Sequence, residues 1–251
     1  MEVISSLSEN YADFDSIKVI YKIEGTVINE SPLRIGSGSS EALGQVDQPV
    51  LMMKYKERRI PVIPGSSWKG ALRSEAERFV RSSQELGRDK GWERWRACDI
   101  FSDEEREREE NDPCVVCLLF GNTGLASHLR IFDSIPIGRY SLETITRVAI
   151  DRITGTQSSG KLFKVQVVSP GTLWSFKMTL INVDPTEDGE VSFLARYLLN
   201  KLTEGIQIGG GRSVGYGLVR LVKEKISVKK LEVSPQGLTS SAVDFSSLIG
   251  R

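Results

Sequence analysis

Histidine is almost absent from this chain, whose 251 residues include one histidine and three cysteines. Long hydrophobic runs are also missing. Because no stretch of about 18 apolar residues occurs, we expect no membrane-spanning helix. The segment Met1–Ser16 lacks the apolar stretch of a secretory signal peptide, so we expect a cytoplasmic location. The composition, 39% hydrophobic and 26% charged, is that of a globular protein able to form a sizeable core.

The chain also has no net charge, because its 33 basic residues balance its 33 acidic ones. Neutrality by itself argues against a nucleic-acid partner. The charges are unevenly distributed, however, because Asp103–Asp112 contains seven acidic and two basic residues. The rest of the chain therefore carries a net positive charge, which can gather on one face. We interpret the acidic run itself as a solvated segment.

Hydrophobic patterns along the chain predict an α+β fold. Leu162–Val168 and Thr172–Ile181 are expected to pair around Pro170-Gly171, Thr144–Gly160 reads as a polar loop, and the tail after Ile226 gives little signal. Without insertions the order is β-α-β-β-α-β, the ferredoxin-like arrangement that RNA-recognition modules also use. The remaining predicted elements are strands at Ile17–Val27, Arg59–Ile63, His128–Asp133 and Gly217–Val222, and helices at Trp68–Arg81 and Val191–Leu202.

The first predicted helix has a marked beginning. Pro64-Gly65 turns the chain, and Ser66 or Ser67 can cap a helix that starts at Trp68. Its apolar stripe consists of Trp68, Leu72, Ala76 and Phe79. A helix N-terminus with a nearby lysine is an anion site, but Lys69 and Arg73 could instead pair with Glu77 and Glu75.

A second unusual segment is Gly205–Gly217, which contains six glycines. Successive amides of such a loop can cradle phosphates, and glycine permits close backbone approach. The order helix–glycines–strand excludes a dinucleotide fingerprint or P-loop, in which a helix follows the glycines. Two interpretations stay open from chemistry alone: a phosphate-binding loop, or a tight connection with Arg212 merely exposed.

All cysteines and the histidine fall within one short segment: Cys98, Cys114, Cys117 and His128. Three thiolates and one imidazole make a closed, structural zinc site. The bracketed segment is charged and poor in apolar residues, so we expect the metal to supply its stability. The alternative is three reduced, partly buried cysteines with an unrelated histidine. Disulfides are disfavoured by the odd number of cysteines.

Three segments together resemble the RAMP superfamily of CRISPR-associated proteins: Ile60–Phe79 (IPVIPGSSWKGALRSEAERF), Cys117–Gly124 (CLLFGNTG) and Gly205–Leu221 (GIQIGGGRSVGYGLVRL). Within that family, Arg34–Leu51 and Arg147–Val168 resemble the backbone subunit of the type III effector complex. The resemblance runs from about residue 17 to residue 221. It implies a single RAMP domain over residues 1–251 with a thumb hairpin at about 144–161, and the cysteines and histidine described above predict a zinc-binding insertion at about 84–127.

The resemblance also implies roles for individual residues. The turn and helix start around Ser66 and the glycine loop would contact a guide RNA backbone, and the thumb would wedge into the guide–target duplex. The RNA-binding residues would be Ser66, Ser67, Lys69, Arg73, Gly209, Gly210, Gly211, Arg212 and Arg152. The expected partners are guide RNA, target RNA, further copies of the chain along the guide, and other type III effector subunits.

Asp47 matches the catalytic aspartate of the target-cleaving subunit. A carboxylate is a weak base at neutral pH but a natural ligand for Mg²⁺ or Mn²⁺, so the resemblance implies metal-dependent RNA cleavage. The preceding loop reads Gly36-Ser37-Gly38, whereas the family has Gly-Gly-Ser.

Three other functions are left open. A structural RNA-coating subunit would need no catalysis, and Asp47 would then only cap its loop. A guide-processing endoribonuclease usually needs a histidine base, and the only histidine here lies in the expected zinc cluster. A zinc-stabilised scaffold would purify without RNA.

Overall fold

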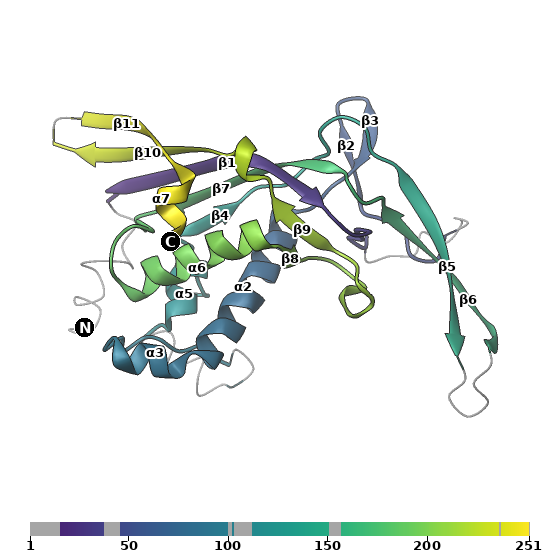
Figure 1. Ribbon diagram of the computed structural model, residues 1–251, viewed down its shortest axis with the longest axis horizontal. Coiled ribbons are helices and arrows are strands. Elements are labelled where there is room, and N and C mark those ends of the chain that lie inside the picture. The colour runs from purple at the N-terminus through teal and green to yellow at the C-terminus, as the bar shows by residue number, and fades with distance from the viewer. Residues whose placement is uncertain are drawn as a thin grey trace.

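The computed structural model describes residues 16–37, 46–99, 102, 112–150, 157–235 and 237–250 (Figure 1). The core lies between a curled antiparallel sheet and helices that cover one of its faces, which confirms the α+β class. The strands are β1 Val19–Asn29, β2 Met52–Tyr55, β3 Arg58–Pro61, β4 Leu129–Ile131, β5 Leu142–Ile150, β6 Gln157–Val168, β7 Leu173–Ile181, β8 Ile206–Gln207, β9 Leu218–Leu221, β10 Ser227–Ser234 and β11 Gly237–Val243. The helices are α2 Gly65–Ser82, α3 Gln84–Asp89, α5 Val115–Phe120, α6 Glu190–Glu204 and α7 Phe245–Ile249, with short 3₁₀ turns η1 Arg212–Val214 and η2 Lys223–Lys225.

Strand β1 is the centre of the main sheet. One of its edges pairs with β10 and then β9, and the other pairs with β7, which in turn pairs with β4. All these pairs are antiparallel. The strands that alternate with α2 and α6 therefore follow the order β9-β1-β7-β4. The ferredoxin-like core stays a prediction, and this strand order fits it.

Helix α2 begins earlier than predicted, at Gly65. Its N-cap residue is Pro64, and the Gly65 amide donates a hydrogen bond to Asp133 Oδ1 at 2.8 Å. The predicted cap at Ser66 or Ser67 is therefore wrong, because the capping carboxylate comes from the segment after β4. The apolar stripe is confirmed, with Val80 more deeply buried than Phe79; its buried members are Trp68, Leu72, Ala76 and Val80.

The largest difference from prediction lies between residues 142 and 168. There, β5 and β6 form a separate two-stranded sheet that projects from the body of the molecule (Figure 1). The segment Thr144–Gly160, expected as a loop, is mostly strand, and its β-branched residues favour that conformation. The expected pairing of β6 with β7 is also wrong, since β6 pairs with β5.

Asn29 explains why β6 and β7 separate. Its side chain donates to Ser169 O at 3.0 Å and accepts from Trp174 Nε1 at 2.9 Å, while its carbonyl accepts from the Gly171 amide at 2.7 Å. The Pro170-Gly171 turn is thereby bound to the end of β1. The two strands consequently enter different sheets, although the turn itself was correctly predicted from the sequence.

The C-terminal segment contains more structure than its sequence indicates. After β9, strands β10 and β11 extend the sheet, and α7 packs on α6 through Phe245 and Leu248. The Asn200 side chain donates to Ile249 O at 2.7 Å, which fixes the end of α7. β10 and β11 are largely exposed, so they carry little hydrophobic periodicity that could be detected in the sequence.

The charged insertion is better packed than expected. Every residue of α5 is buried, and Trp95 packs at the edge of Phe79 and Phe193. The sequence reasoning was wrong to treat the segment between Cys98 and His128 as unable to bury itself. The short apolar run of α5 places this part of the segment in the hydrophobic core.

Candidate functional site

Asp47 lies at the base of the β5–β6 hairpin. Its side chain is exposed, and its Oδ2 accepts a hydrogen bond from the Lys164 amide of β6 at 2.7 Å. The next residue, Gln48, donates to Lys164 O at 3.1 Å and accepts from the Gln166 amide at 3.0 Å. Backbone pairing with β6 therefore fixes the position of Asp47, and its charged side chain stays accessible.

Within the described residues, the one group of three or more metal-binding side chains consists of cysteines and does not include Asp47. A divalent ion at Asp47 would therefore take further ligands from water or from a bound phosphate. This matches the general behaviour of Mg²⁺, which keeps several waters and uses one or two carboxylates.

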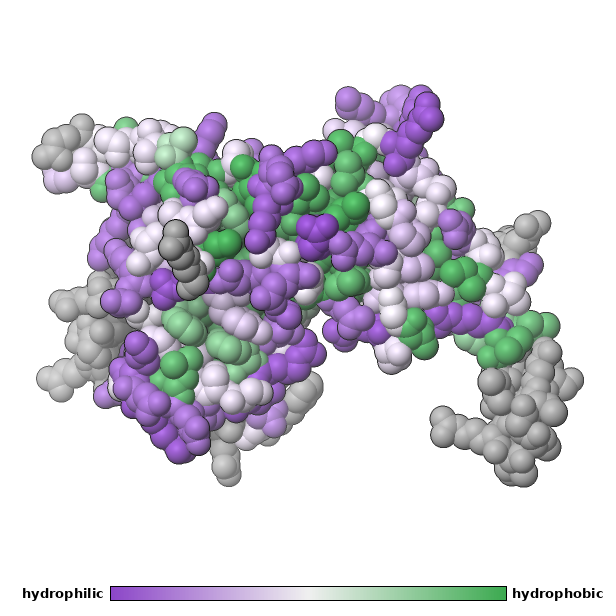
Figure 2. Space-filling view, viewed as in Figure 1, coloured by the Kyte–Doolittle hydropathy of each residue, from purple (hydrophilic) through white to green (hydrophobic). Residues whose placement is uncertain are grey.

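The hairpin above Asp47 carries exposed apolar side chains. Val148 and Leu162 are directly opposite each other in the β5–β6 register and are 46% and 57% exposed. Figure 2 shows hydrophobic surface along the described part of this hairpin. An exposed apolar pair on a projecting hairpin suits contact with the flat face of a base. Arg152, predicted to bind RNA, lies outside the described residues.

The glycine loop approaches the chain's own backbone closely. The Gly210 amide donates to Arg34 O at 2.9 Å, and a Cβ on Gly209 would lie 2.2 Å from the same oxygen. A Cβ on Gly217 would lie 2.0 Å from Ile208 O. Both Gly209 and Gly217 have positive φ. The tight-connection interpretation therefore holds for these two glycines, and phosphate binding by the loop stays a prediction.

The tip of the glycine loop borders a polar cleft. Arg212 is exposed on η1, and the cleft beside it has a volume of about 470 Å³. Arginine and lysine side chains of α2, α6 and the loop outnumber the acidic groups in its lining, since its charged residues are Glu75, Arg78, Lys201 and Arg212.

The start of α2 presents a mixed charge. Ser66 is exposed and Ser67 half-buried, so both hydroxyls can be reached from solvent. The half-buried Lys69 amine has no hydrogen-bond or ion-pair partner in the part of the chain that the structure describes. Burial, followed by the charge of Arg73, lowers the pKa of Lys69. Because Asp133 already caps the helix, an anion here would depend on Lys69 more than on the helix dipole.

Arg73 is occupied by internal contacts. Its guanidinium donates to Glu77 Oε1 at 3.0 Å, to Gly121 O at 3.0 Å and to Cys117 Sγ at 3.3 Å. The predicted alternative of an Arg73–Glu77 ion pair is therefore observed. The other proposed acid, Glu75, contacts Arg78 and Tyr197 instead.

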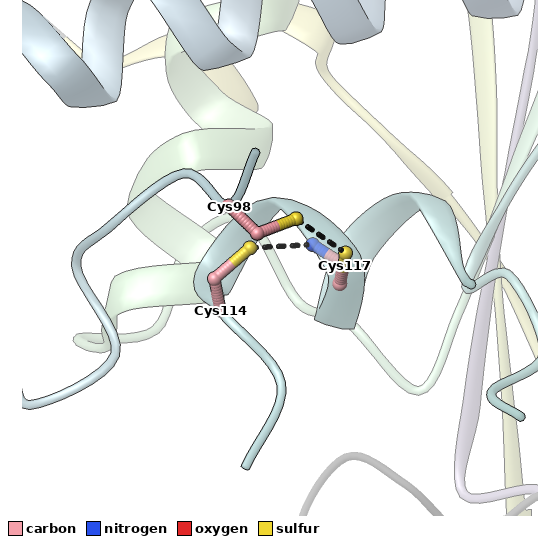
Figure 3. A group of neighbouring side chains, drawn as sticks. All are labelled: Cys98, Cys114 and Cys117. Atoms are coloured by element: carbon pink, nitrogen blue, oxygen red, sulfur yellow. Dashed lines mark hydrogen bonds between the residues drawn. The ribbon is translucent and has the colours of Figure 1, made fainter. Parts of the chain in front are cut away.

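Three buried cysteines gather beside Arg73 (Figure 3). Their sulfur atoms lie within 4.8 Å of one another, with Cys98 Sγ and Cys117 Sγ 3.5 Å apart. Cys114 caps α5 by accepting from the Cys117 amide at 3.4 Å. Hydrogen bonds with Cys114 and Cys98, together with burial, raise the pKa of Cys117. With Zn–S bonds of about 2.3 Å, three thiolates at this spacing fit three corners of a tetrahedral site.

His128 is not a member of this group. The imidazole is fully buried at the start of β4, and its Nδ1 lies 2.7 Å from Ile181 O on β7. Proximity in sequence therefore did not place the imidazole among the three sulfur atoms. The thiol cluster is a candidate metal centre with three described ligands.

Two groups of basic residues near the site were not among the predicted site residues. One is Arg34, which lies within the Gly/Ser-rich segment and packs against the glycine loop. The other is the tip of the β2–β3 hairpin, where Lys54, Lys56, Arg58 and Arg59 are all exposed. The alternation of cations in Lys54–Arg59 was a usable signal for the second. Nothing in the sequence shows that the Nε atom of Arg34 is buried.

The family is decided by comparison with known proteins. A family model described as the RAMP superfamily matches residues 27–220. The chain belongs to the RAMP superfamily. A relative from Methanocaldococcus jannaschii, named CRISPR system Cms endoribonuclease Csm3, is 28% identical over 219 residues, which are 84% of this chain and 82% of the relative. A relative of the same name from Streptococcus thermophilus is 25% identical over 220 residues, which are 81% of this chain and 88% of the relative.

These matches confirm the resemblance deduced from the motifs. The RAMP match begins within β1 and ends within β9, so it spans α2, the thiol cluster, the β5–β6 hairpin and the glycine loop. Within the described residues, none of the helices combines the length and apolar character needed to cross a membrane.

Proposed function

We propose that this protein is a guide-RNA-binding backbone subunit of a type III CRISPR effector complex that cleaves guide-paired target RNA. The names of its two relatives support an endoribonuclease of such a system. The observation that carries the proposal is the position of Asp47: an accessible carboxylate, fixed by β6, at the base of a projecting hairpin with an apolar surface.

The hairpin would act as the thumb. Its exposed Val148 and Leu162 would pack against bases and separate one nucleotide from the guide–target duplex. A separated nucleotide can rotate its 2′-hydroxyl into line with the adjacent phosphorus, which a regular helix prevents. Asp47 lies beside the same hairpin. The phosphate next to the separated nucleotide would therefore lie close to the Asp47 carboxylate.

Asp47 would orient the reacting phosphate through a divalent ion. Mg²⁺ or Mn²⁺, when bound, stabilises negative charge that develops on the phosphate oxygens. The carboxylate of Asp47 would hold the ion, and the Lys164 amide would hold the carboxylate. Attack by the 2′-hydroxyl then breaks the phosphodiester bond and leaves a cyclic phosphate and a 5′-hydroxyl.

The test is target cleavage in the assembled complex, with matched target RNA and added Mn²⁺. We expect Asp47→Ala and Asp47→Asn to reduce cleavage on the order of 100-fold or more, because each removes the charge that holds the ion. Asp47→Asn keeps an oxygen that can accept from the Lys164 amide, so it separates lost charge from a disturbed strand. Guide and target binding should stay near normal in both variants, and chelator should stop the wild-type reaction.

Two results would contradict the catalytic part. Equal cleavage by wild type and both variants would remove Asp47 from the mechanism. No cleavage by a wild-type complex that binds guide and target would favour the non-catalytic, RNA-coating alternative. Cleavage of unpaired guide precursor would instead favour the guide-processing endoribonuclease.

Guide binding would involve Lys69, Arg212 and the basic cleft beside Arg212. These groups contact backbone and not bases, so binding should be independent of sequence and several copies could follow one guide. We also propose that residues 1–251 form a single RAMP domain with a ferredoxin-like core, and that Cys98, Cys114 and Cys117 hold a structural zinc ion. Zinc would stabilise the segment between Cys98 and α5 and take no part in cleavage.

A further inference from the structure

Arg34 is held in place but left unneutralised. Its neighbours are fixed by backbone pairing, Leu33 with Val168 and Ile35 with Leu51. Its Nε atom is buried and has no hydrogen-bond partner within the described residues. A buried donor without a partner is costly, commonly about 1–3 kcal/mol and more for a charged group. A ligand or an ordered water can supply the missing acceptor in such a position.

The glycine loop is shaped around this guanidinium. A Cβ on Gly210 would lie 2.8 Å from one terminal nitrogen of Arg34, and a Cβ on Gly36 would lie 3.1 Å from the other. Neither glycine could carry a side chain without displacing the guanidinium. The pocket is therefore fitted to Arg34 on two sides, although no acidic group neutralises it within the described part of the chain.

A second arginine faces the same place from the thumb. The guanidinium carbon of Arg147, on β5, lies 4.5 Å from the centre of the Tyr216 ring, and that ring packs against Gly211. Burial, followed by the charge of Arg147, lowers the pKa of Arg34. Two cations thus repel each other at the junction of the thumb and the glycine loop. Only an anion between them would relieve both the repulsion and the unpaired donor.

We propose that Arg34 and Arg147 bind one phosphodiester group of RNA between them and so connect the thumb to the core. The proposal rests on the RNA-binding function given above and deepens it. Planar guanidinium groups bind two phosphate oxygens at once, which favours a phosphodiester over a simple halide ion. Tyr216 is a positioning residue, since it holds Arg147 by stacking and need not touch the RNA.

The position of this site has a structural consequence. β5 pairs only with β6 among the described strands, and the hairpin joins the body mainly through the bridges Leu33–Val168 and Gln48–Val165. A phosphate held by Arg34 and Arg147 would add a link between β5 and the segment after β1. Arg147 is next in sequence to Thr146, which pairs with Lys164, the residue that fixes Asp47. Bound RNA backbone would thus steady the strand pair that carries the carboxylate.

The test uses the full chain and three single variants: Arg34→Met, Arg147→Met and, as a control, Arg88→Met. Arg88 is exposed on α3, at the end of the molecule opposite the thumb (Figure 1). Binding of single-stranded RNA is measured over a series of salt concentrations. We expect each cluster variant to bind roughly tenfold more weakly than wild type, as for lost charged hydrogen bonds, and the control to bind normally.

Three further measurements make the test specific. The Arg34→Met/Arg147→Met double variant should lose less affinity than the product of the two single losses, because both arginines hold one phosphate. Inorganic phosphate should raise the melting temperature of wild type more than that of either variant. Weakening with guide strand alone would identify a guide phosphate, and weakening only with a guide–target duplex would identify a target phosphate.

The outcomes separate the two proposals. If wild type binds RNA and both cluster variants bind single strand and guide–target duplex like Arg88→Met, the paired-arginine site is wrong and the proposed function stands. If wild type does not bind RNA while phosphate still stabilises it through both arginines, the proposed function fails and the anion site stands. If Arg34→Met does not fold, the Arg147→Met variant tests the site by itself, because Arg147 is half-exposed. RNA binding and stabilisation by phosphate are then measured for that variant alone.

Discussion

Arg73 and Arg34 are both partly buried arginines, and the protein treats them in opposite ways. Arg73 lies on the thiol side of the molecule, which we define as Arg73, Glu77 and the three cysteines, and it contacts an acid, a carbonyl and a sulfur. Arg34 lies on the loop side, defined as Arg34, Arg147, Tyr216 and the glycine loop. Its buried Nε has no partner in the described part of the chain.

This difference separates structural from functional basic residues. A guanidinium that is satisfied internally has few donors left for a ligand, whereas an unsatisfied one gains the full benefit of binding an anion. The resemblance implied an RNA contact for Arg73 and none for Arg34. The contacts favour the reverse assignment, so basic residues in such a protein are better ranked by their existing partners than by charge alone.

The largest effect should follow from disrupting the thiol side. We expect about one zinc ion per wild-type chain by elemental analysis, and none in Cys114→Ser. Losing a structural metal belongs to the most destabilising class of substitutions, on the order of 4 kcal/mol. In a chain of this size that lowers the melting temperature by about 10 °C.

Val116→Ala is the matched control for this prediction. Val116 is buried in α5 between two of the cysteines, so its truncation costs packing energy but should leave the metal bound. A wild-type protein that is well folded and contains no metal would exclude zinc and leave a thiol cluster stabilised by burial alone.

A smaller effect should distinguish the two arginines directly. Arg73→Met leaves Gly121 O and Cys117 without their donor, at a cost of about 2 kcal/mol, or roughly 4–8 °C in melting temperature. Arg34→Met removes an unpaired buried charge, so the RNA-free variant should unfold at a temperature no lower than that of wild type. Thermal unfolding in a buffer without phosphate or sulfate measures the melting temperatures of both variants. Equal destabilisation by the two substitutions would contradict the comparison.

The same comparison shows what the sequence could and could not predict. The apolar stripe of α2 and the helix at α6 follow from local periodicity, and both were predicted. The pairing of β6 with β5 depends on Asn29, a residue far away in sequence that binds the Pro170-Gly171 turn. Such long-range hydrogen bonds leave no local pattern.

In the candidate site, too, some features could be predicted from the sequence and others could not. The gathering of Cys98, Cys114 and Cys117 was predicted from their spacing and is observed, whereas His128 turns to a carbonyl on β7 because β4 places it in the sheet. Asp47 was found by resemblance, and only the structure shows the amide that holds it. The burial of Arg34 arises where β1, the glycine loop and the thumb meet, and no single segment encodes it.

The smallest effect concerns two cations of the predicted guide face, one half-buried and one exposed. Lys69 and Arg212 have no side-chain hydrogen bond or ion pair with the residues that the structure describes. Each can therefore contribute one contact to a phosphate of single-stranded RNA. We expect Lys69→Ala and Arg212→Ala each to reduce the slope of log affinity against log salt by about 0.7, with the same reduction for every RNA sequence.

The side chains also differ in how they would hold a phosphate. A cation that contacts a phosphate through charge alone acts through counterion release, so its substitution should matter less as salt rises. Arg34, whose buried Nε would donate a hydrogen bond to its phosphate, should keep part of its effect at high salt, where screening weakens the contacts made through charge alone. If Lys69→Ala and Arg212→Ala bind RNA normally at every salt concentration, the guide face lies elsewhere. The exposed tip of the β2–β3 hairpin would then be the next surface to substitute, beginning with Lys54 and Arg58.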